Sequence, residues 1–522
     1  MRPHPRAALL APLLTLALGT TLAVAPTAGA ADPGSAGTTQ ERKAAEAALD
    51  AAQDALAGQG QGRGVDQTLA MRDLFIAKDA LRGADRASAE RLLARPTTPP
   101  DDPNDPRDIY YGPDADLKTQ CNAAFCLHWV EEGPHASTPE FAATAFATIE
   151  HVAGVYAAAG FKRPLPDAGQ EGDTRMDFYL GDIDSVGALG YCRSDADGPV
   201  VGSAWYAYCG FDNDYASTPW LSPQAALGIT VAHEYFHAVQ FAYDAEDDGW
   251  LMESTATAME DVLYDDVNDN AFFLNYGQMG DPSFYPLAGP STPLDTYDLT
   301  AYGNWGFWRF LTEKYDDTTA GVPNLVRQVW EALDTTKRPN TLYSLQAIDK
   351  VLAARRTSTP DQYAAYADAN QHPADSYDEA VEQAYPTAPN TIESVQLARK
   401  SPSARRSATL DHLTSATGEV LPFAGSKLLL VRVDLDDAKV ARAVVTVNRA
   451  GGGTWTTPVP VAKNGRGFVI VPFVNGKVSS VEVTLANGST RMTGCGGGSA
   501  YSCGGTSPDD GLAAEVRFQA VG

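Results

Sequence analysis

The residues with the clearest chemical potential lie in the segment VAHEYFHAVQF, residues 231–241, where His233 and His237 flank Glu234. In an α-helix, residues i and i+4 project from one face, so both imidazoles can bind one metal ion while Glu234 reaches a water molecule on it. The spacing therefore predicts a metal site. The alternative is two histidines packed on an amphipathic helix, and neighbouring segments must decide between the two interpretations.

A catalytic zinc ion takes three protein ligands and keeps one position for water, so the motif requires a third His, Glu or Asp. The segment GWLMESTATAMED, residues 249–261, offers Glu253 sixteen positions after His237. This separation leaves room for a turn through the acidic segment 244–249 and for the first turn of a returning helix. Glu253 is therefore the candidate third ligand.

HEYFH followed by WLMESTA resembles the zinc-binding segments of the gluzincin metallopeptidases, the group of thermolysin and the zinc aminopeptidases. The resemblance implies that His233, His237 and Glu253 bind zinc and that Glu234 is the general base of peptide hydrolysis. More loosely, the leader, zinc helix and β-rich tail resemble secreted bacterial metalloproteases in the style of immune inhibitor A. The gluzincin resemblance is strong over residues 223–261 and extends over about residues 120–335.

Further residues after Glu253 also follow the family pattern. Ala256 and Glu260 stand three and seven positions after it, as in the second helix of the aminopeptidases, which implies that Thr257 or Glu260 supports the ligands through hydrogen bonds. Ser254 replaces the usual glycine, and the two motifs are closer together than is common. No Gly-x-Met-Glu-Asn signature precedes them, so recognition of a substrate N-terminus is not implied.

Related enzymes stabilise the oxyanion with a Tyr or His after the second helix, which makes Tyr302 in TAYGNWGFW the candidate donor. Tyr297 is an alternative, and Tyr302 could equally be a core aromatic beside Trp305 and Trp308. Peptides would bind as an extended strand along ALGYC (188–192) or SAWYAYC (203–209). The other histidines of this part of the chain, His128, His135 and His151, are expected to be structural.

The elements that must position these residues follow from hydrophobic periodicity. We expect strands at 125–132 and 175–183, and helices at 138–160, 223–243, 250–264, 303–315 and 322–334. This mixed order predicts an α+β fold, and the resemblance implies a zincin-like catalytic domain over residues 107–400. Short apolar runs separated by turns predict a β-sandwich over residues 401–522, which serves either surface attachment or stabilisation of the catalytic unit.

The N-terminus predicts export. Arg2 and Arg6 precede the apolar run 7–24, and AGA at 28–30 offers a cleavage site, so residues 1–30 form a signal peptide rather than a membrane anchor. Residues 31–106 then hold a helical hairpin (38–96) with a Gly-rich break at 58–64, and a Pro/Asp-rich linker (95–106). This leader is either a propeptide or a permanent cap. It lacks cysteine, so any inhibition by it must be steric.

Six cysteines suit the extracellular compartment, and proximity predicts the pairs Cys121–Cys126, Cys192–Cys209 and Cys495–Cys503. The net charge of −27 argues against a nucleic-acid partner. Calcium is a second candidate cofactor, at the acidic segments 244–249 and 265–270. No Gly-x-Ser-x-Gly elbow or unpaired cysteine favours a nucleophilic mechanism.

The sequence thus predicts a secreted, monomeric zinc endopeptidase that acts on peptides or proteins. The alternative is a secreted binding or surface protein whose zinc site is structural or degenerate and whose β domain carries the activity. The presence of Glu234 favours the peptidase.

Overall fold

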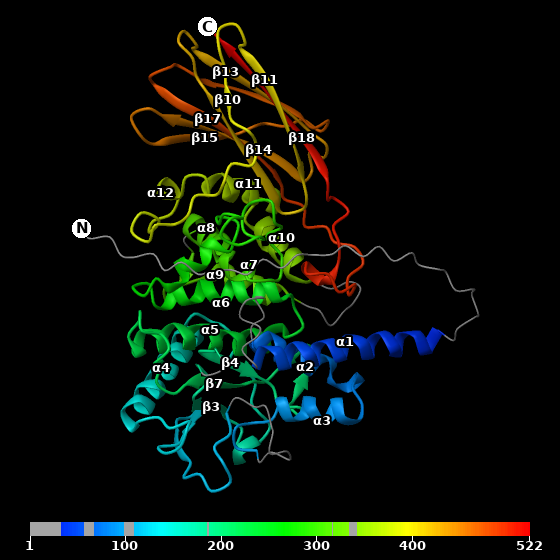
Figure 1. The fold of residues 1–522 in the computed structure, drawn as a ribbon, viewed down its shortest axis with the longest axis vertical. Coiled ribbons are helices and arrows are strands. Elements are labelled where there is room, and N and C mark those ends of the chain that lie inside the picture. Colours follow the sequence, from blue (N-terminus) through cyan, green and yellow to red (C-terminus); the bar gives the residue numbers. More distant parts are fainter. Residues whose placement is uncertain (1–32, 57–66, 99–108, 185–186, 316, 334–341) are drawn as a thin grey trace.

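The computed structural model describes residues 33–56, 67–98, 109–184, 187–315, 317–333 and 342–522, with side chains from Thr39 onward. The predicted signal peptide, the Gly-rich break at 58–64 and most of the linker lie outside these ranges. Three tiers follow one another along the long axis: the leader with a five-stranded sheet, a layer of helices, and a strand-rich C-terminal domain (Figure 1). The fold is α+β.

The first sheet has the order β1-β2-β3-β7-β4. Its strands are β1 (Lys118–Cys121), β2 (Phe125–Trp129), β3 (Met176–Gly181), β7 (Tyr208–Asp212) and β4 (Gly190–Arg193). β2, β3 and β7 are parallel, and the edge strands β1 and β4 are antiparallel to their neighbours. Every residue of β3 is buried, as its sequence MDFYLG, apolar except for Asp177, favours for a central strand. A two-stranded hairpin, β5 (Val200–Val201) and β6 (Ala204–Trp205), precedes β7.

Two helices next to this sheet begin where the sequence predicts. α4 (Pro139–Ala158) and α5 (Pro223–Asp244) each start with a proline after a hydroxyl residue, and the Thr138 and Ser222 side chains accept hydrogen bonds from the first-turn amides of Phe141 and Ala225. α5 is buried from Ala226 to its end and packs against α6 (Gly249–Leu263). The two helices therefore form the centre of the molecule.

The helical layer beyond α6 consists of short elements. They are η4 (Asp269–Asn275), α7 (Thr300–Gly303), α8 (Trp305–Tyr315), the hairpin β8 (Thr318–Thr319) and β9 (Val322–Pro323), α9 (Asn324–Ala332), α10 (Ser344–Ala354), α11 (Thr359–Ala369) and α12 (Pro373–Ser376). The single helix predicted at 303–315 is divided at Asn304. Gly303 lies so close to Gly277 that a Cβ on it would be 2.1 Å from the Gly277 nitrogen, and this contact fixes the chain where the helix is interrupted.

The leader contains α1 (Pro33–Leu56), α2 (Gln67–Ala77), the 3-10 turn η1 (Lys78–Ala80) and α3 (Gly83–Leu92). α1 packs against α2 as the predicted hairpin, but the second stretch is not one helix. Leu81 and Arg82 are extended and Gly83 takes a φ of +57°, a conformation that favours glycine, so the chain turns there. Leu49, Leu69 and other leader side chains belong to the same buried core as the body.

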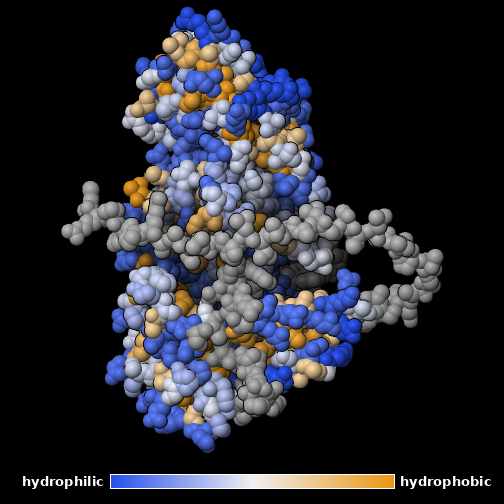
Figure 2. All heavy atoms as spheres, in the orientation of Figure 1, coloured by the Kyte–Doolittle hydropathy of each residue, from blue (hydrophilic) through white to orange (hydrophobic). Residues whose placement is uncertain are grey.

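The C-terminal domain is a β-sandwich with its own core, in which both sheets contribute buried valines and leucines. One sheet has the order β10-β12-β17-β14-β15 and the other β11-β18-β13-β16. The strands are β10 (Val395–Gln396), β11 (Ser403–Leu410), β12 (Thr414–Leu421), β13 (Leu428–Leu435), β14 (Ala441–Arg449), β15 (Thr454–Pro458), β16 (Arg466–Pro472), β17 (Val478–Asn487) and β18 (Leu512–Val521). Hydrophobic residues lie among hydrophilic ones on its face in Figure 2.

All six cysteines are paired as the sequence predicts. Cys121–Cys126 closes the β1–β2 hairpin, Cys192–Cys209 joins β4 to β7, and Cys495–Cys503 closes a glycine-rich loop before β18. Within the described ranges, none of the helices has the length and apolarity needed to cross a bilayer.

Candidate metal centre

Two neighbouring helices bring the three predicted ligands together. His233 and His237 lie on α5 and Glu253 lies on α6, and all three are buried. His233 Nε2 is 3.3 Å from Glu253 Oε2, and His237 Nε2 is 3.7 Å from Glu253 Oε1. One potential ligand atom from each residue lies within 4.8 Å of the other two. The spacing in the sequence therefore does produce a convergent group of two imidazoles and one carboxylate.

Several polar atoms of this group are buried without a hydrogen bond. They are His237 Nε2 and both carboxylate oxygens of Glu253; the 3.3 Å approach of His233 Nε2 lacks the alignment of a hydrogen bond. A buried polar atom without a partner costs about 1–3 kcal/mol, and more when it is charged, so native proteins rarely retain one without a reason. A cation among these three residues would satisfy all of these atoms, and two nitrogens with one carboxylate oxygen are a donor set that zinc accepts.

Gln240 fixes the proton on His237, although the sequence analysis did not single it out. The Gln240 amide nitrogen donates to the Met252 carbonyl (2.9 Å) and to Thr255 Oγ1 (3.1 Å), so its oxygen must face His237 Nδ1 at 2.7 Å. Nδ1 therefore carries the proton and the lone pair of Nε2 faces Glu253. Burial lowers the pKa of His237 to about 4, which keeps the ring in the neutral form that binds metals.

Glu260 holds the other histidine. Its Oε1 lies 2.6 Å from His233 Nδ1. Glu260 follows Glu253 on α6 by about two helical turns. Burial alone would lower the pKa of His233, but the carboxylates of Glu253 and Glu260 outweigh it and raise that pKa. Thr257, the other residue expected to support the ligands, is buried, and its hydroxyl has no hydrogen-bond partner among the described residues.

A cavity of about 370 Å³ opens beside this centre and is lined by His233, Glu234 and Tyr302. The Tyr302 ring stacks on His233 with 6.0 Å between ring centroids and 10° between planes. Tyr297, the alternative oxyanion donor, does not line this cavity and packs against Gly249. Of the two tyrosines, Tyr302 is the one placed at the site.

Another wall of the cavity is formed by Gly190, the first residue of the edge strand β4, and by Leu189 before it. A Cβ on Gly190 would lie 2.8 Å from Glu234 Cγ and 2.6 Å from Thr230 Cγ2, so only glycine lets the strand pass this close to α5. Cys192 pairs with Cys209 at a Cα separation of 4.1 Å, typical of a position whose amide points away from the neighbouring strand. The Cys192 amide thus faces the open edge of the strand that the sequence analysis predicts to bind an extended peptide.

The leader occupies that edge. Thr68 Oγ1 donates to Glu234 Oε2 at 2.9 Å and accepts from the Cys192 amide at 2.9 Å. Gln67 lines the cavity and accepts a hydrogen bond from Arg193 of β4 at 3.1 Å. One turn of α2 therefore contacts both Glu234, the expected general base, and the backbone amide of the edge strand.

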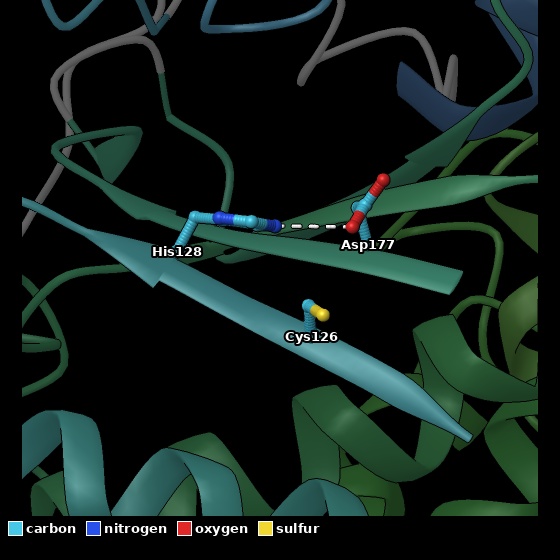
Figure 3. Close-up of side chains that lie close together, drawn as sticks. All are labelled: Cys126, His128 and Asp177. Carbon is cyan, nitrogen blue, oxygen red and sulfur yellow. Dashed lines mark hydrogen bonds and ion pairs between the residues drawn. The ribbon is translucent and has the colours of Figure 1, made fainter. Parts of the chain in front are cut away.

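Arg95 anchors the other end of the leader. Its buried guanidinium bonds Asp167 (3.1 Å), Asp195 (2.8 Å) and Asp177. On the sheet, Asp177 also bonds His128 Nε2 at 3.0 Å, as Figure 3 shows for β2 and β3. Cys126, His128 and Asp177 lie as close together as metal ligands do, but the Cys126 sulfur is committed to its disulfide. That group is therefore a structural contact.

Two acidic groups bear on the calcium prediction: Asp182 with Asp184 and Asp212, and Asp261 with Asp265 and Glu379. The second group includes one residue of the acidic segment 265–270, but Arg309 pairs with Asp261 at 2.5 Å and with Glu379 at 3.5 Å. A cation is thus already supplied by the chain. Of the other histidines, His135 bonds the Asp182 amide at 3.2 Å and His151 is exposed.

The C-terminal domain supports the start of α6. Within its disulfide loop, Ser502 Oγ accepts from Trp250 Nε1 at 2.8 Å, and the Cys503 amide donates to Asp248 Oδ1 at 2.6 Å. Trp250 and Asp248 precede Glu253 by one or two turns of chain. The β-sandwich therefore helps to fix the helix that carries the third candidate ligand.

Comparisons with known proteins add little to this geometry. No protein family and no curated protein matches the sequence. Among solved structures, a surface-associated copper-binding protein of Methylomicrobium album BG8, important in copper acquisition, aligns with 11% identity over 26% of this chain and 100% of its own, at a TM-score of 0.16. A family GH115 4-O-methyl-α-glucuronidase with specificity for decorated arabinogalactans aligns with 10% identity over 70% of this chain and 54% of its own, at 0.14. Neither score supports an inference about fold or function.

Proposed function

We propose that this chain is a secreted zinc-dependent metallopeptidase with a zincin-like catalytic domain of the gluzincin type. The observation that carries the proposal is the convergence of His233, His237 and Glu253 beside a cavity that Glu234 also lines, with His237 Nε2 and both Glu253 carboxylate oxygens buried and without hydrogen bonds. The mixed sheet adds support, because its antiparallel edge strand borders that cavity and offers the backbone of a peptide-binding strand. The disulfides favour an extracellular protein.

Each residue then has a defined task. His233, His237 and Glu253 would hold zinc, which when bound acidifies water and polarises a carbonyl group. Glu234 accepts the proton of the attacking water and delivers it to the leaving amine. The Tyr302 hydroxyl donates a hydrogen bond to the oxygen that becomes negative as the carbonyl carbon is attacked. Glu260 and Gln240 orient the two imidazoles.

The leader would act as a propeptide. Thr68 engages Glu234 and the Cys192 amide, which a substrate needs, so the uncut chain is expected to be nearly inactive. The buried Arg95 and the shared core show that the leader also contributes to folding, so activity is best measured on a chain that folds intact and is cut afterwards. A recognition sequence for a site-specific protease, introduced into the segment 99–108, allows the chain to be cut after it has folded.

The test compares zinc content and casein hydrolysis of the cut wild type with those of Glu234→Gln and of Glu132→Gln, an exposed control. We expect one zinc per chain in all three and hydrolysis in all but Glu234→Gln. One zinc without hydrolysis in any of them would favour the secreted binding protein instead. Absence of zinc from the wild type would contradict the proposed zinc site and therefore the proposed function.

A further inference from the structure

The cavity contains one carboxylate that the proposed reaction does not use. Asp269, the first residue of η4, lines the same cavity as His233 and Glu234. It is partly buried, and its Oδ1 accepts a hydrogen bond from Trp220 Nε1 at 3.1 Å. Trp220 is itself 67% exposed, so this pair lies where the cavity meets solvent. The indole supplies one hydrogen bond and no positive charge.

The charges around Asp269 are unbalanced. Three carboxylates line the cavity, those of Glu234, Glu260 and Asp269, and no Lys or Arg stands among its described lining residues. Glu260 is engaged by His233, and a divalent ion would compensate Glu253 and Glu234. Burial raises the pKa of Asp269, with the Trp220 hydrogen bond acting against it, as expected for a carboxylate that has no cation beside it among the residues that the structure describes.

Apolar side chains also line this cavity. Ile229 lies one turn before His233 on α5, Phe273 lies one turn after Asp269 on η4, and Leu299 comes just before α7. A hydrocarbon chain can pack between these side chains while a charged end reaches a carboxylate, which is how lysine and arginine divide their apolar and charged parts. The cavity thus combines a hydrocarbon-binding wall with a single uncompensated negative charge.

We infer that Asp269 forms a subsite for a positively charged group of the substrate, and that the enzyme prefers a lysine or arginine side chain next to the bond it cleaves. This inference rests on the proposed peptidase function. The same carboxylate could receive the free amine of a substrate N-terminus, so the shared chemistry is a cation with an apolar neck and the experiment must separate the two sources.

The experiment uses the chain cut in segment 99–108 and a series of peptides that differ at one position. Lysine, arginine, norleucine or glutamate is placed in turn at each position flanking the cleaved bond, with the N-terminus either free or acetylated. kcat/KM is measured for the wild type, for Asp269→Asn and for Asp266→Asn, an exposed neighbouring control. Dissociation constants for the same peptides are measured by calorimetry in the zinc-loaded Glu234→Gln background, with and without Asp269→Asn.

We expect lysine and arginine peptides to exceed the norleucine peptide by about tenfold in kcat/KM and in affinity, and Asp269→Asn but not Asp266→Asn to abolish the difference. A lysine preference that persists after acetylation assigns the cation to the side chain, whereas a preference for the free over the acetylated N-terminus, with lysine and norleucine equal, assigns it to the N-terminus and overturns the side-chain preference. Cleavage without a preference for either cation, or with one that Asp269→Asn retains, overturns the subsite and leaves the peptidase standing. Binding that depends on Asp269 without any cleavage supports the subsite and overturns the peptidase; neither cleavage nor binding overturns both.

Discussion

Two buried histidines of this molecule, His237 and His412, have opposite surroundings. His412 joins the β-sandwich to the helical layer, and both its ring nitrogens face carboxylates, Asp295 at 3.1 Å and Asp510 at 2.6 Å. These outweigh burial and raise its pKa to about 9. His237 faces the Gln240 amide oxygen on one side and has no hydrogen bond on the other, and burial lowers its pKa to about 4.

We infer from this difference that His412 is a structural histidine and that His237 is suited to bind a metal ion. Both side chains are fully buried, so burial alone decides nothing. His412 is charged and satisfied by the protein itself, which serves cohesion between domains. His237 is neutral, its tautomer is set by Gln240, and its remaining lone pair faces a carboxylate that also lacks hydrogen bonds. A cation bound there would satisfy the atoms that lack hydrogen bonds in the second arrangement.

The largest expected effect comes from removing each histidine in turn. His237→Asn should lower zinc affinity by more than about a hundredfold, beyond the usual cost of losing a supporting residue, and should abolish hydrolysis. It should change the metal-free stability by only about 1 kcal/mol, since Nδ1 makes a single neutral hydrogen bond. His412→Asn should leave zinc affinity and hydrolysis nearly unchanged, and it should lower the metal-free stability by more than His237→Asn does. Zinc titration against a competing chelator and urea unfolding of both variants measure this; equal zinc loss in the two variants would invalidate the distinction.

The dependence of stability on pH tests the charge of His412. The folded-state pKa of His412, about 9, lies above its ordinary value of 6.5, so the stabilisation is fully present below pH 6.5 and is lost as pH rises through 9. This pKa shift corresponds to a stabilisation of about 3 kcal/mol. The urea midpoint of the zinc-saturated protein should therefore fall between pH 6 and 9.5, and this fall should be smaller in His412→Gln. The exposed His151→Gln serves as control, and an unchanged slope in His412→Gln would refute the assignment.

Substitutions of Gln240 test the surroundings of His237, the neutral histidine. Gln240→Leu removes the acceptor that holds the His237 Nδ1 proton and should lower zinc affinity about tenfold to a hundredfold. Gln240→Glu keeps an acceptor at that position and should recover part of the affinity. Both affinities come from chelator competition, with the folded fraction checked by circular dichroism. A Leu variant that binds zinc like the wild type would mean that Gln240 has no role in setting the tautomer.

The smallest effect concerns the hydrogen bond between the leader and Glu234. Thr68→Ala should raise the hydrolytic activity of the uncut, zinc-loaded chain by about fivefold, since one hydrogen bond contributes about 1 kcal/mol. Ser88→Ala, which removes a contact within the leader, should leave it unchanged. Equal activities for uncut Thr68→Ala, uncut wild type and the cut chain would show that the leader does not block the site.

The fold was predictable where local patterns dominate. Periodicity and helix-start residues place α4 and α5 within one or two residues, because Thr138-Pro139 and Ser222-Pro223 begin helices by local chemistry. The parallel pairing of β3 with β7 depends on contacts across more than thirty residues of sequence and has no such local signal. The division of the leader at Leu81 depends on Gly83 taking a positive φ, which the sequence permits but does not require.

The candidate site divides in the same way. The convergence of His233, His237 and Glu253 follows from helical spacing and a recognisable second motif. Gln240 had a signal that was not used, because it stands three residues after His237 and shares its helix face. Thr68 and Asp269 reach the cavity only through tertiary packing, Thr68 from 166 residues away in sequence, so neither could be assigned from local patterns.

The most direct measurement is diffraction from crystals of the zinc-treated protein, recorded on both sides of the zinc absorption edge. We predict an anomalous peak at about 2.0–2.2 Å from His233 Nε2, His237 Nε2 and a Glu253 carboxylate oxygen, with Gln240 and Glu260 still bonded to the two Nδ1 atoms. No peak there in a zinc-saturated crystal, or one only at another group such as Asp261, Asp265 and Glu379, would contradict it.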